Sequence, residues 1–297
     1  MKYDLTNLVF SLQENDPSLR GLGLILEKEI LHYDILYALQ QGKFLEGLTF
    51  CGGTALRLCH GAPRLSEDLD FEGGEDFAAG QMGGIETCLK DFLGNRYGLH
   101  VKVRPPKDRS EAFDVPVNTW RISVITNPKK RDLPWQHIHL DIATIPSNLN
   151  EKLPLKLNYT CLPKESGDIK ICVKSKESII ADKIVAFSST LERGYPRWRD
   201  LWDLWWLTEK GVKSDVGLIK KRSQDCNQNN LNERINQSLE KIPELLLQND
   251  FIAQMSRFLP PEIVLAKIKD ETWRKNFSEH LCCLFSDIQC KLTSGGI

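Results

Sequence analysis

The spacing of apolar side chains changes twice along this chain. In the first part, apolar positions recur three and four residues apart, as at Leu22, Leu26 and Ile30, which is the spacing of one helix face. From Leu48 onward, short apolar runs alternate with polar residues between glycines and prolines, a pattern typical of half-buried strands. After Ser175 the helical spacing returns and continues almost to the end. The pattern therefore predicts an α+β region followed by an all-helical region.

The alternating region divides into strands and two helices. The expected strands cover residues 48–51, 65–71, 99–103, 119–126 and 137–145, with shorter pieces at 155–161 and 169–173, and the expected helices cover 54–60 and 77–96. Because Pro and Gly punctuate the chain before its purely helical part, we place a domain boundary at residue 170. The predicted domains are residues 1–170, a mixed sheet with flanking helices, and residues 171–297, which are helical.

The composition is that of an ordinary folded protein. Of the 297 residues, 41% are hydrophobic and 27% are charged, which excludes the fibrous and disordered classes. No stretch approaches the roughly 20 apolar residues of a membrane span, and the N-terminal residues lack an apolar signal segment. The nine cysteines are scattered, without a CxxC pair, as expected for reduced thiols. We therefore expect a cytoplasmic protein with no membrane partner.

The net charge of −1 gives no global signature of nucleic-acid binding. It does not exclude a local basic surface, because a partner responds to nearby charges and not to their sum. One basic run comprises Lys102, Arg104, Lys107, Arg109, Arg121, Lys129, Lys130 and Arg131. Acidic residues interleave with this run, so a solvated loop face and a phosphate-binding patch both remain open.

A pair of glycines, Gly52 and Gly53, follows the first predicted strand and precedes a helix. Glycines there let the backbone approach a phosphate closely, and the free N–H groups at the helix start point toward that charge. Asp68 and Asp70 lie two residues apart on the next predicted strand, so both carboxylates share one face. Carboxylates in this arrangement suit Mg²⁺ that is shared with substrate phosphates. Asp141, on a later alternating strand, supplies a third carboxylate for a two-metal arrangement.

The order of these residues resembles a known family. The string Gly52-Gly53-Thr54-x-Leu56, followed by Arg64-x-Ser66-x-Asp68-x-Asp70, is similar to the AbiEii-like family of abortive-infection, type IV toxins. That family belongs to the polymerase-beta-like nucleotidyltransferase superfamily. The resemblance implies a nucleotidyltransferase-fold mixed sheet with flanking helices, followed by an all-helical C-terminal domain.

A second block of residues agrees with this resemblance. Lys183, on a predicted helix, and the run Arg199-Asp200-x-x-Asp203 are similar to the third and fourth motifs of the family. Lys183 flanks an apolar helix face, from which an ammonium could reach a triphosphate. Its alternatives are a lysine whose stem lies along apolar surface and a salt bridge to Asp203 or Asp182. Between the two aspartates of the run, the family's last motif favours Asp203.

The resemblance also implies roles for individual residues. The catalytic set is Asp68, Asp70, Asp141, Lys183 and Asp203, and the first three of these would bind Mg²⁺ or Mn²⁺. The nucleotide-binding set is Gly52, Gly53, Thr54, Arg64, Ser66 and Lys183. Many relatives carry a lysine where this chain has Leu58, so we expect the missing cation to come from Lys183. The helical domain would then contribute Lys183 and the segment from Arg199 to Asp203 to a cleft.

The function implied is transfer of a nucleoside monophosphate from an NTP to an acceptor, with release of pyrophosphate. The resemblance implies a toxin that acts on RNA, with the 3′ end of tRNA as one acceptor, and a cognate antitoxin protein as partner. The near-neutral charge equally permits a small-molecule or protein hydroxyl as acceptor. A non-catalytic interaction protein that retains the fold is the alternative from another class. The retained carboxylates argue against it, because carboxylates brought together repel one another unless a metal or a proton relieves them.

Overall fold

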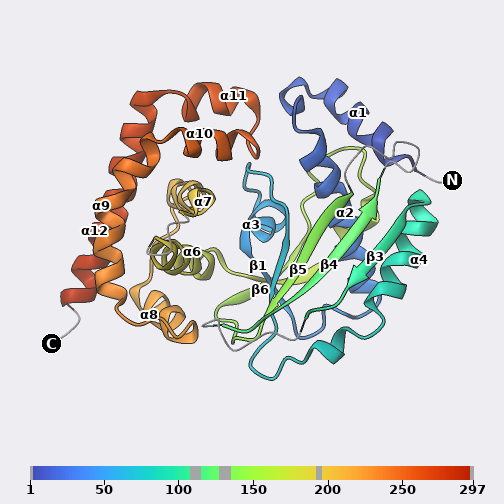
Figure 1. The fold of residues 1–297 in the computed structure, drawn as a ribbon, viewed down its shortest axis with the longest axis horizontal. Coiled ribbons are helices and arrows are strands. Elements are labelled where there is room, and N and C mark those ends of the chain that lie inside the picture. Colours follow the sequence, from blue (N-terminus) through green and yellow to red (C-terminus); the bar gives the residue numbers. More distant parts are fainter. Residues whose placement is uncertain (1–2, 108–114, 127–134, 192–195, 295–297) are drawn as a thin grey trace. The chain divides into compact units, whose positions relative to one another are not determined.

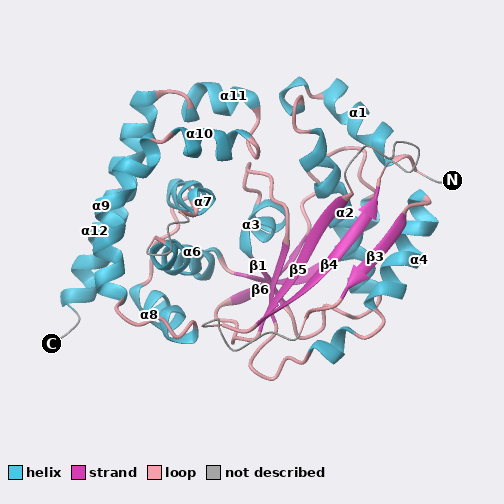
Figure 2. Cartoon of the chain, in the orientation of Figure 1, coloured by secondary structure: helices cyan, strands magenta, loops and turns pink. Residues whose placement is uncertain are grey.

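The computed structural model describes residues 3–107, 115–126, 135–191 and 196–294. The chain forms two compact units, Met1–Lys174 and Ser175–Ile297, which we call the sheet unit and the helical unit. Figure 1 gives the course of the chain, and Figure 2 its helices and strands. The domain boundary expected at residue 170 falls at the start of the last strand, β7 (Lys170–Lys174), with which the sheet unit ends.

The described residues of the sheet unit form one seven-stranded sheet in the order β3-β4-β5-β2-β1-β7-β6. The other strands are β1 (Thr49–Cys51), β2 (Leu69–Glu72), β3 (His100–Arg104), β4 (Val117–Ile125), β5 (Gln136–Ala143) and β6 (Asn150–Pro154). β2 pairs with β5, and β1 with β7, in parallel, whereas the other neighbouring strands are antiparallel. This mixed sheet, followed by a helical unit, confirms the predicted α+β fold class.

The helices of the sheet unit lie before, between and after the strands. They are α1 (Leu5–Asn15), η1 (Pro17–Leu19), α2 (Gly23–Gln41), α3 (Gly52–Ala55), η2 (Leu56–His60), η3 (Ala79–Met82), α4 (Ile85–Tyr97) and α5 (Lys164–Asp168). The helix expected at 54–60 therefore begins at the glycine pair itself. Its second half, η2, is a turn of π-helix.

Strand β5 shows which face of the sheet the helices cover. Ile138, Leu140 and Ile142 are buried, and Gln136, which shares their face, donates hydrogen bonds to Leu24 O and Glu27 Oε2 of α2. Helix α4 packs on β3 in the same way (Figure 1). Because successive residues of a strand point to opposite faces, the polar residues of β5 lie on the face away from α2.

Two expected element boundaries are wrong for identifiable reasons. The strand expected at 65–71 begins only at Leu69, because β5 bonds to the side chain of Asp68 and not to its main chain. The helix expected at 77–96 begins only at Ile85, because Gly84 has a positive φ of 89° that interrupts the helix.

The strand expected at 155–161 is absent from the described structure, where β6 ends at Pro154 instead. The backbone of Lys156 explains this difference. Its N–H donates to Leu58 O at 2.7 Å, and its carbonyl accepts from the Tyr33 hydroxyl at 2.5 Å. Both groups are thus used by residues of helices and are not available to a ladder.

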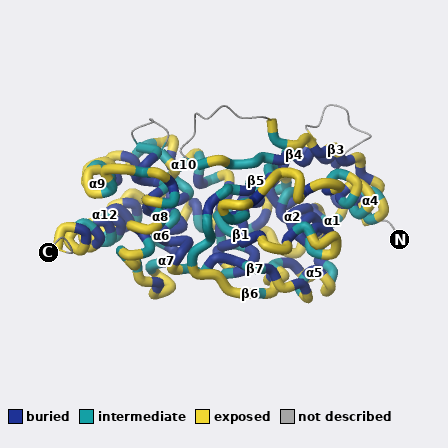
Figure 3. Tube along the Cα trace, turned by 90° about the horizontal axis from the view of Figure 1, so that it is seen from below, coloured by how far each residue is buried: buried dark blue, intermediate teal, exposed yellow. Residues whose placement is uncertain are grey.

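The described part of the helical unit contains α6 (Lys176–Thr190), α7 (Trp198–Glu209), α8 (Val216–Asp225), α9 (Leu231–Leu247), α10 (Asn249–Ser256), α11 (Pro261–Ile263), η4 (Val264–Ile268) and α12 (Glu271–Ser294). Long helices α9 and α12 pack along each other, and α6 packs against α7, α8 and α9. Figure 3 shows buried and exposed stretches alternating along these helices. Rings of α7 and α12 build an aromatic cluster, in which Trp273 and Phe277 stack at 4.8 Å and Trp205 contacts both.

None of the helices in the described ranges is both long enough and apolar enough to cross a membrane.

Candidate functional site

The site begins where strand β1 passes directly into helix α3. Gly52, the first residue of α3, has a φ of +74°, a conformation that L side chains rarely adopt. A Cβ atom at Gly52 would overlap the carboxylate of Asp70 on the neighbouring strand. Glycine at this position therefore allows both the turn and the close approach of the Asp70 carboxylate to the backbone.

The second glycine makes room for two predicted nucleotide-binding residues. A Cβ atom at Gly53 would lie 2.5 Å from Nη2 of Arg64 and 2.9 Å from Oγ of Ser66. Both side chains are buried, and Arg64 Nη1 donates to the carbonyl of Leu65 at 2.8 Å. The structure thus brings the guanidinium of Arg64 and the hydroxyl of Ser66 against the glycine turn, where a positive charge and a hydroxyl donor could serve a phosphate.

Asp68 lies just before β2 and is held by two neighbouring elements. The His139 N–H donates to Asp68 Oδ1 at 3.1 Å, and the His139 Nδ1 atom lies 3.2 Å from the same oxygen. Thr54 donates its hydroxyl to the Asp68 carbonyl at 2.5 Å. One oxygen of Asp68 is therefore used to join β2 to β5, while its side chain remains 33% exposed.

Asp70 and Asp141 are register partners on the parallel strands β2 and β5. Neighbouring strands lie about 4.8 Å apart and partner residues share a face, so the two half-buried carboxylates lie side by side. The topology accordingly joins residues that are distant in sequence at one point of the sheet. Carboxylates this close favour a bound cation or a shared proton.

A divalent cation fits this carboxylate pair. No cluster of three His, Cys, Asp or Glu side chains that could hold a metal occurs among the described residues, so Asp68 does not complete a preformed three-ligand set. Mg²⁺ is nevertheless held in many proteins by one or two carboxylates together with substrate phosphates. The Asp70–Asp141 pair, beside the glycine turn, supplies two such carboxylates.

The residue that replaces the family's lysine is unable to contact a phosphate. Leu58 is completely buried, and its carbonyl accepts the backbone N–H of Lys156. The adjacent Arg57 is also committed, because its Nε donates to Glu29 Oε1 at 3.0 Å and its Nη1 donates to two backbone carbonyls. Within the described sheet unit, Arg64 is the cation that the structure places against the glycine pair.

In the helical unit, Lys183 of α6 lies between two aspartates of α7. Its Nζ atom is 2.8 Å from Asp200 Oδ1 and 2.7 Å from Asp203 Oδ2, and all three side chains are buried. Arg197 adds a further contact to Asp200. Of the alternatives open from the sequence, the salt bridge to Asp203 is present, and Asp182 pairs instead with Arg222 at 3.0 Å. The predicted contact of Lys183 with a triphosphate stays a prediction.

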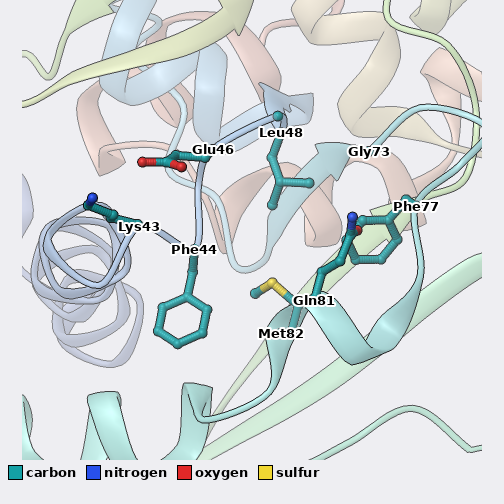
Figure 4. Close-up of a pocket in the computed structure, with 9 residues that line it drawn as sticks. Lys43, Phe44, Glu46, Leu48, Gly73, Phe77, Gln81 and Met82 are labelled. Carbon is teal, nitrogen blue, oxygen red and sulfur yellow. The ribbon is translucent and has the colours of Figure 1, made fainter.

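A pocket of about 210 Å³ elsewhere in the sheet unit contains none of the predicted site residues. Figure 4 shows its lining, in which Phe44, Phe77 and Met82 surround the space beside Leu48. Leu48 directly precedes β1, so it lies at the end of the β1–β2 ladder that is farther from Gly52. This pocket is therefore separate from the carboxylates.

His139 is a site residue that the sequence interpretation left unassigned. Its ring contacts Asp68, and it shares the polar face of β5 with Asp141. The signal was present in the alternation of residues 137–141, which places His139 and Asp141 on one side of the strand. What the sequence could not show is that the neighbour of His139 across the ladder is Asp68.

Comparisons with known proteins identify the family of this chain and proteins of similar fold. A family model described as nucleotidyl transferase AbiEii toxin, type IV toxin–antitoxin system, matches residues 34–278. The fold is similar to MenT4, a nucleotidyltransferase toxin from Mycobacterium tuberculosis, with 15% identity, a TM-score of 0.53 and coverage of 95% of this chain and 89% of that chain. It is also similar to JHP933 from Helicobacter pylori, with 17% identity, a TM-score of 0.52 and coverage of 91% and 94%. At these identities, the two structures inform the fold alone. No curated protein sequence matches the chain.

Proposed function

This chain belongs to the AbiEii family of nucleotidyltransferase toxins of type IV toxin–antitoxin systems, and from that premise we propose that its Asp70–Asp141 pair carries a metal-dependent nucleotidyl transfer. In this reaction an acceptor hydroxyl attacks the α-phosphorus of an NTP. A bond to the acceptor oxygen forms, the bond to the bridging oxygen breaks, and pyrophosphate leaves. Family membership favours this enzyme over the interaction protein that the sequence left as an alternative.

The observation that carries the proposal is the juxtaposition of Asp70, Asp141 and Gly52. The two aspartates are register partners, and the Asp70 carboxylate lies directly against the Gly52 backbone. Phosphates placed at the glycine turn would therefore be adjacent to both carboxylates. A divalent cation, Mg²⁺ or Mn²⁺, would be held by these carboxylates and would offset the charge of the NTP phosphates.

The remaining residues of the sheet unit receive supporting roles. Ser66 and Arg64 would donate to the phosphates at the turn, because their polar atoms already approach Gly53. Thr54 would fix the backbone at Asp68, whose carbonyl it bonds. We propose that Asp68 remains a metal ligand through the oxygen that His139 does not bond. Asp141 would either join the metal site or accept the proton of the acceptor hydroxyl.

Two roles predicted for the helical unit belong to the same proposal. Lys183 would offset the charge of the transferring phosphates, and Asp203 would hold its ammonium in place. RNA is the proposed acceptor, with a small molecule or a protein hydroxyl as the alternatives. As a member of a type IV toxin family, the protein is expected to have an antitoxin partner.

The test of the proposal is a transfer assay with α-³²P-labelled NTPs, Mg²⁺ and total cellular RNA. Wild-type protein should label an RNA species, whereas D70N and D141N should each lose about 100-fold or more of that activity. D76N, which neutralises an exposed aspartate of the same unit, serves as the matched control and should keep full activity. Undiminished labelling by D70N would contradict the proposal.

A further inference from the structure

A basic surface lies on the polar face of the sheet, next to the carboxylates. Of the basic run in the sequence, Arg109, Lys129, Lys130 and Arg131 lie outside the described residues. A surface that we call the basic face is formed by Lys102 and Arg104 of β3, Arg121 of β4, and His137 of β5 with the preceding Trp135. Together with Ser123, these residues line a pocket of about 500 Å³. That volume lies in the range of small-ligand sites.

Strand register places the basic face and the carboxylates on the same side of the sheet. Arg104 pairs with Arg121, and Arg121 pairs with His139, which contacts Asp68. In the next row of the sheet, Asp141 pairs with Asp70. Because register partners point to one face, the side chains on this face change from acidic at β2 to basic at β3.

The cations of the basic face are not paired with carboxylates of the described residues. Lys102 helps to lower the pKa of Glu86 on α4, but no ion pair joins Arg104 or Arg121 to a carboxylate of the described residues, and the buried Nε atom of Arg121 has no hydrogen-bond partner among them. Burial lowers the pKa of His137, and the neighbouring Arg121, Lys28 and Arg104 lower it further. This face therefore has an excess of positive charge even though the whole chain is nearly neutral.

Trp135 adds an aromatic surface to these charges. It is 44% exposed, so its ring is accessible at the basic face. An exposed indole beside guanidinium groups provides the two contacts that single-stranded nucleic acids use. Bases stack on the ring, and phosphates pair with the cations.

The separation between the two regions fits an extended acceptor. Strands β3 and β2 are three strand spacings apart, which is about 14 Å. A phosphate at Lys102 or Arg104 is therefore distinct from the NTP phosphates that the proposed function places at Gly52. An extended polynucleotide is long enough to occupy both places at once.

We propose that the basic face binds the backbone of a single-stranded RNA acceptor, stacks one of its bases on Trp135, and so directs its reacting end to Asp70 and Asp141. This inference rests on the proposed function, in which RNA is the acceptor, and adds to it the surface and the residues that hold that acceptor. An acidic protein segment would also be attracted by the cations, but it offers no base for Trp135.

The test is binding of a 5′-fluorescein-labelled 12-nucleotide RNA, followed by fluorescence anisotropy without NTP at several salt concentrations. The double variant K102A/R104A removes two exposed side chains of β3, and K152A/K170A removes two exposed lysines from the strands at the other edge of the sheet as a charge-matched control. The first variant should weaken binding at least about tenfold and reduce the salt slope by about 1.4, since each single-strand phosphate contact contributes about 0.7. The control should bind as the wild type does.

Trp135 is tested separately in the same assay. W135A should weaken binding by about 5- to 100-fold with little change in the salt slope, whereas W135F, which keeps an aromatic ring, should retain most of the affinity. Unlabelled polyglutamate of equal charge should compete poorly. Competition by polyglutamate as strong as that by the unlabelled RNA would assign the face to an acidic protein and overturn the inference.

The variants also separate this inference from the proposed function. D70N should bind the RNA normally and yet transfer no nucleotide. If K102A/R104A binds RNA as tightly as the wild type while D70N loses transfer, the RNA surface is wrong and the proposed function stands. If K102A/R104A loses RNA binding while D70N still transfers nucleotide, the RNA surface stands and the carboxylate assignment fails.

Discussion

Both units of this protein contain a pair of aspartates, but the surroundings of the two pairs differ. In the helical unit, Asp200 and Asp203 share the ammonium of Lys183, and all three groups are buried. In the sheet unit, Asp70 and Asp141 are half-buried neighbours, and the Asp70 carboxylate lies against the backbone of Gly52. The first pair shares a buried ammonium of its own unit, whereas the second consists of partly exposed carboxylates on one face of the sheet.

This difference teaches how the two pairs should respond to substitution. Removing one partner of a buried ion pair leaves an uncompensated charge in a low-dielectric surrounding, which costs stability. Neutralising a half-exposed carboxylate removes a ligand contact at little cost to the fold. The helical pair should therefore be sensitive in unfolding experiments, and the sheet pair in activity experiments.

The largest effect on stability is expected for K183A. Loss of the ammonium leaves Asp200 and Asp203 buried together, which should lower the free energy of unfolding by about 3–5 kcal/mol. Urea unfolding followed by tryptophan fluorescence measures this change. The triple variant K183A/D200N/D203N, which removes all three charges, should recover part of the loss. Unchanged stability of K183A would contradict the structural role.

The same variant also sharpens the catalytic prediction for Lys183. If its ammonium acts on the triphosphate, folded K183A should show a raised KM for NTP and a lowered kcat, because the charge helps both ground and transition states. K183R should recover only part of the activity, since the guanidinium differs in shape from an ammonium. Normal kinetic constants in the folded fraction of K183A would restrict Lys183 to its ion pairs.

A glycine substitution breaks the sheet site without removing a charge. G52A should displace the Asp70 carboxylate and lower kcat/KM at least about tenfold, in addition to backbone strain of about 1–2 kcal/mol. G21A is the matched control, because Gly21 has a similar φ of +83° and open space around its Cβ position. It should show the strain alone. Equal activity losses in both variants would mean that the approach of Asp70 to Gly52 is unimportant.

The acid sensitivity of the sheet unit should depend on His32. Burial lowers the pKa of this histidine to about 4 from an ordinary value of 6.5, and its Nε2 atom lies 2.9 Å from Glu67 O, next to Asp68. The folded state then binds fewer protons than the unfolded state between these values. The contribution of His32 to stability is therefore fully present above pH 6.5 and is lost as the pH falls toward 4.

This pH dependence is measured by comparing the wild type with H32Q by urea unfolding from pH 7.5 to 4. The stability advantage of the wild type should shrink as the pH falls, by at most about 1.4 kcal/mol per pH unit. Burial raises the pKa of Asp34 to about 6, which acts in the opposite direction. Asp34 is present in both proteins, so its contribution cancels in the difference. A pH-independent difference would show that His32 is not the titrating group.

The smallest effect is expected for the hydroxyl of Thr54. T54V removes its hydrogen bond to the Asp68 carbonyl and should cost about 1 kcal/mol of stability, with a few-fold loss of transfer activity. T54S keeps the hydroxyl and should behave as the wild type does. Equal behaviour of T54V and T54S in both assays would leave Asp68 to be positioned by His139 alone.

The fold class could be predicted from the sequence because it depends on local patterns of apolar and polar residues. The alternation in β5 and the helical spacing after Ser175 each reflect which side chains face a core, and they predicted the mixed sheet and the helical unit. Boundaries failed where tertiary contacts replaced local ones. The side chain of Asp68, and not its main chain, accepts the hydrogen bond from the His139 N–H of β5. The backbone of Lys156 bonds to Leu58 and Tyr33 and not to a neighbouring strand.

For the site, the sequence supplied the residue types but not their partners. The spacing of Asp68 and Asp70 suggested two equivalent carboxylates, yet the structure joins Asp68 to His139 and sets Asp70 beside Asp141. Likewise, the sequence placed Lys183 near an apolar helix face but did not reveal that two aspartates enclose its ammonium. Ladder register and helix packing decide these pairings, and neither is encoded in a local pattern.

The central claim is that Asp70 and Asp141 together hold a divalent cation for the NTP. It is tested most directly by titrating Mn²⁺, followed by electron paramagnetic resonance, into the protein in the presence of a non-hydrolysable α,β-imido NTP. The wild type and D76N should bind Mn²⁺ with the same affinity, and D70N and D141N should each bind it about tenfold or more weakly while unfolding at the same urea concentration. If D70N and D141N bind Mn²⁺ as tightly as the wild type, the carboxylate pair is not the metal site.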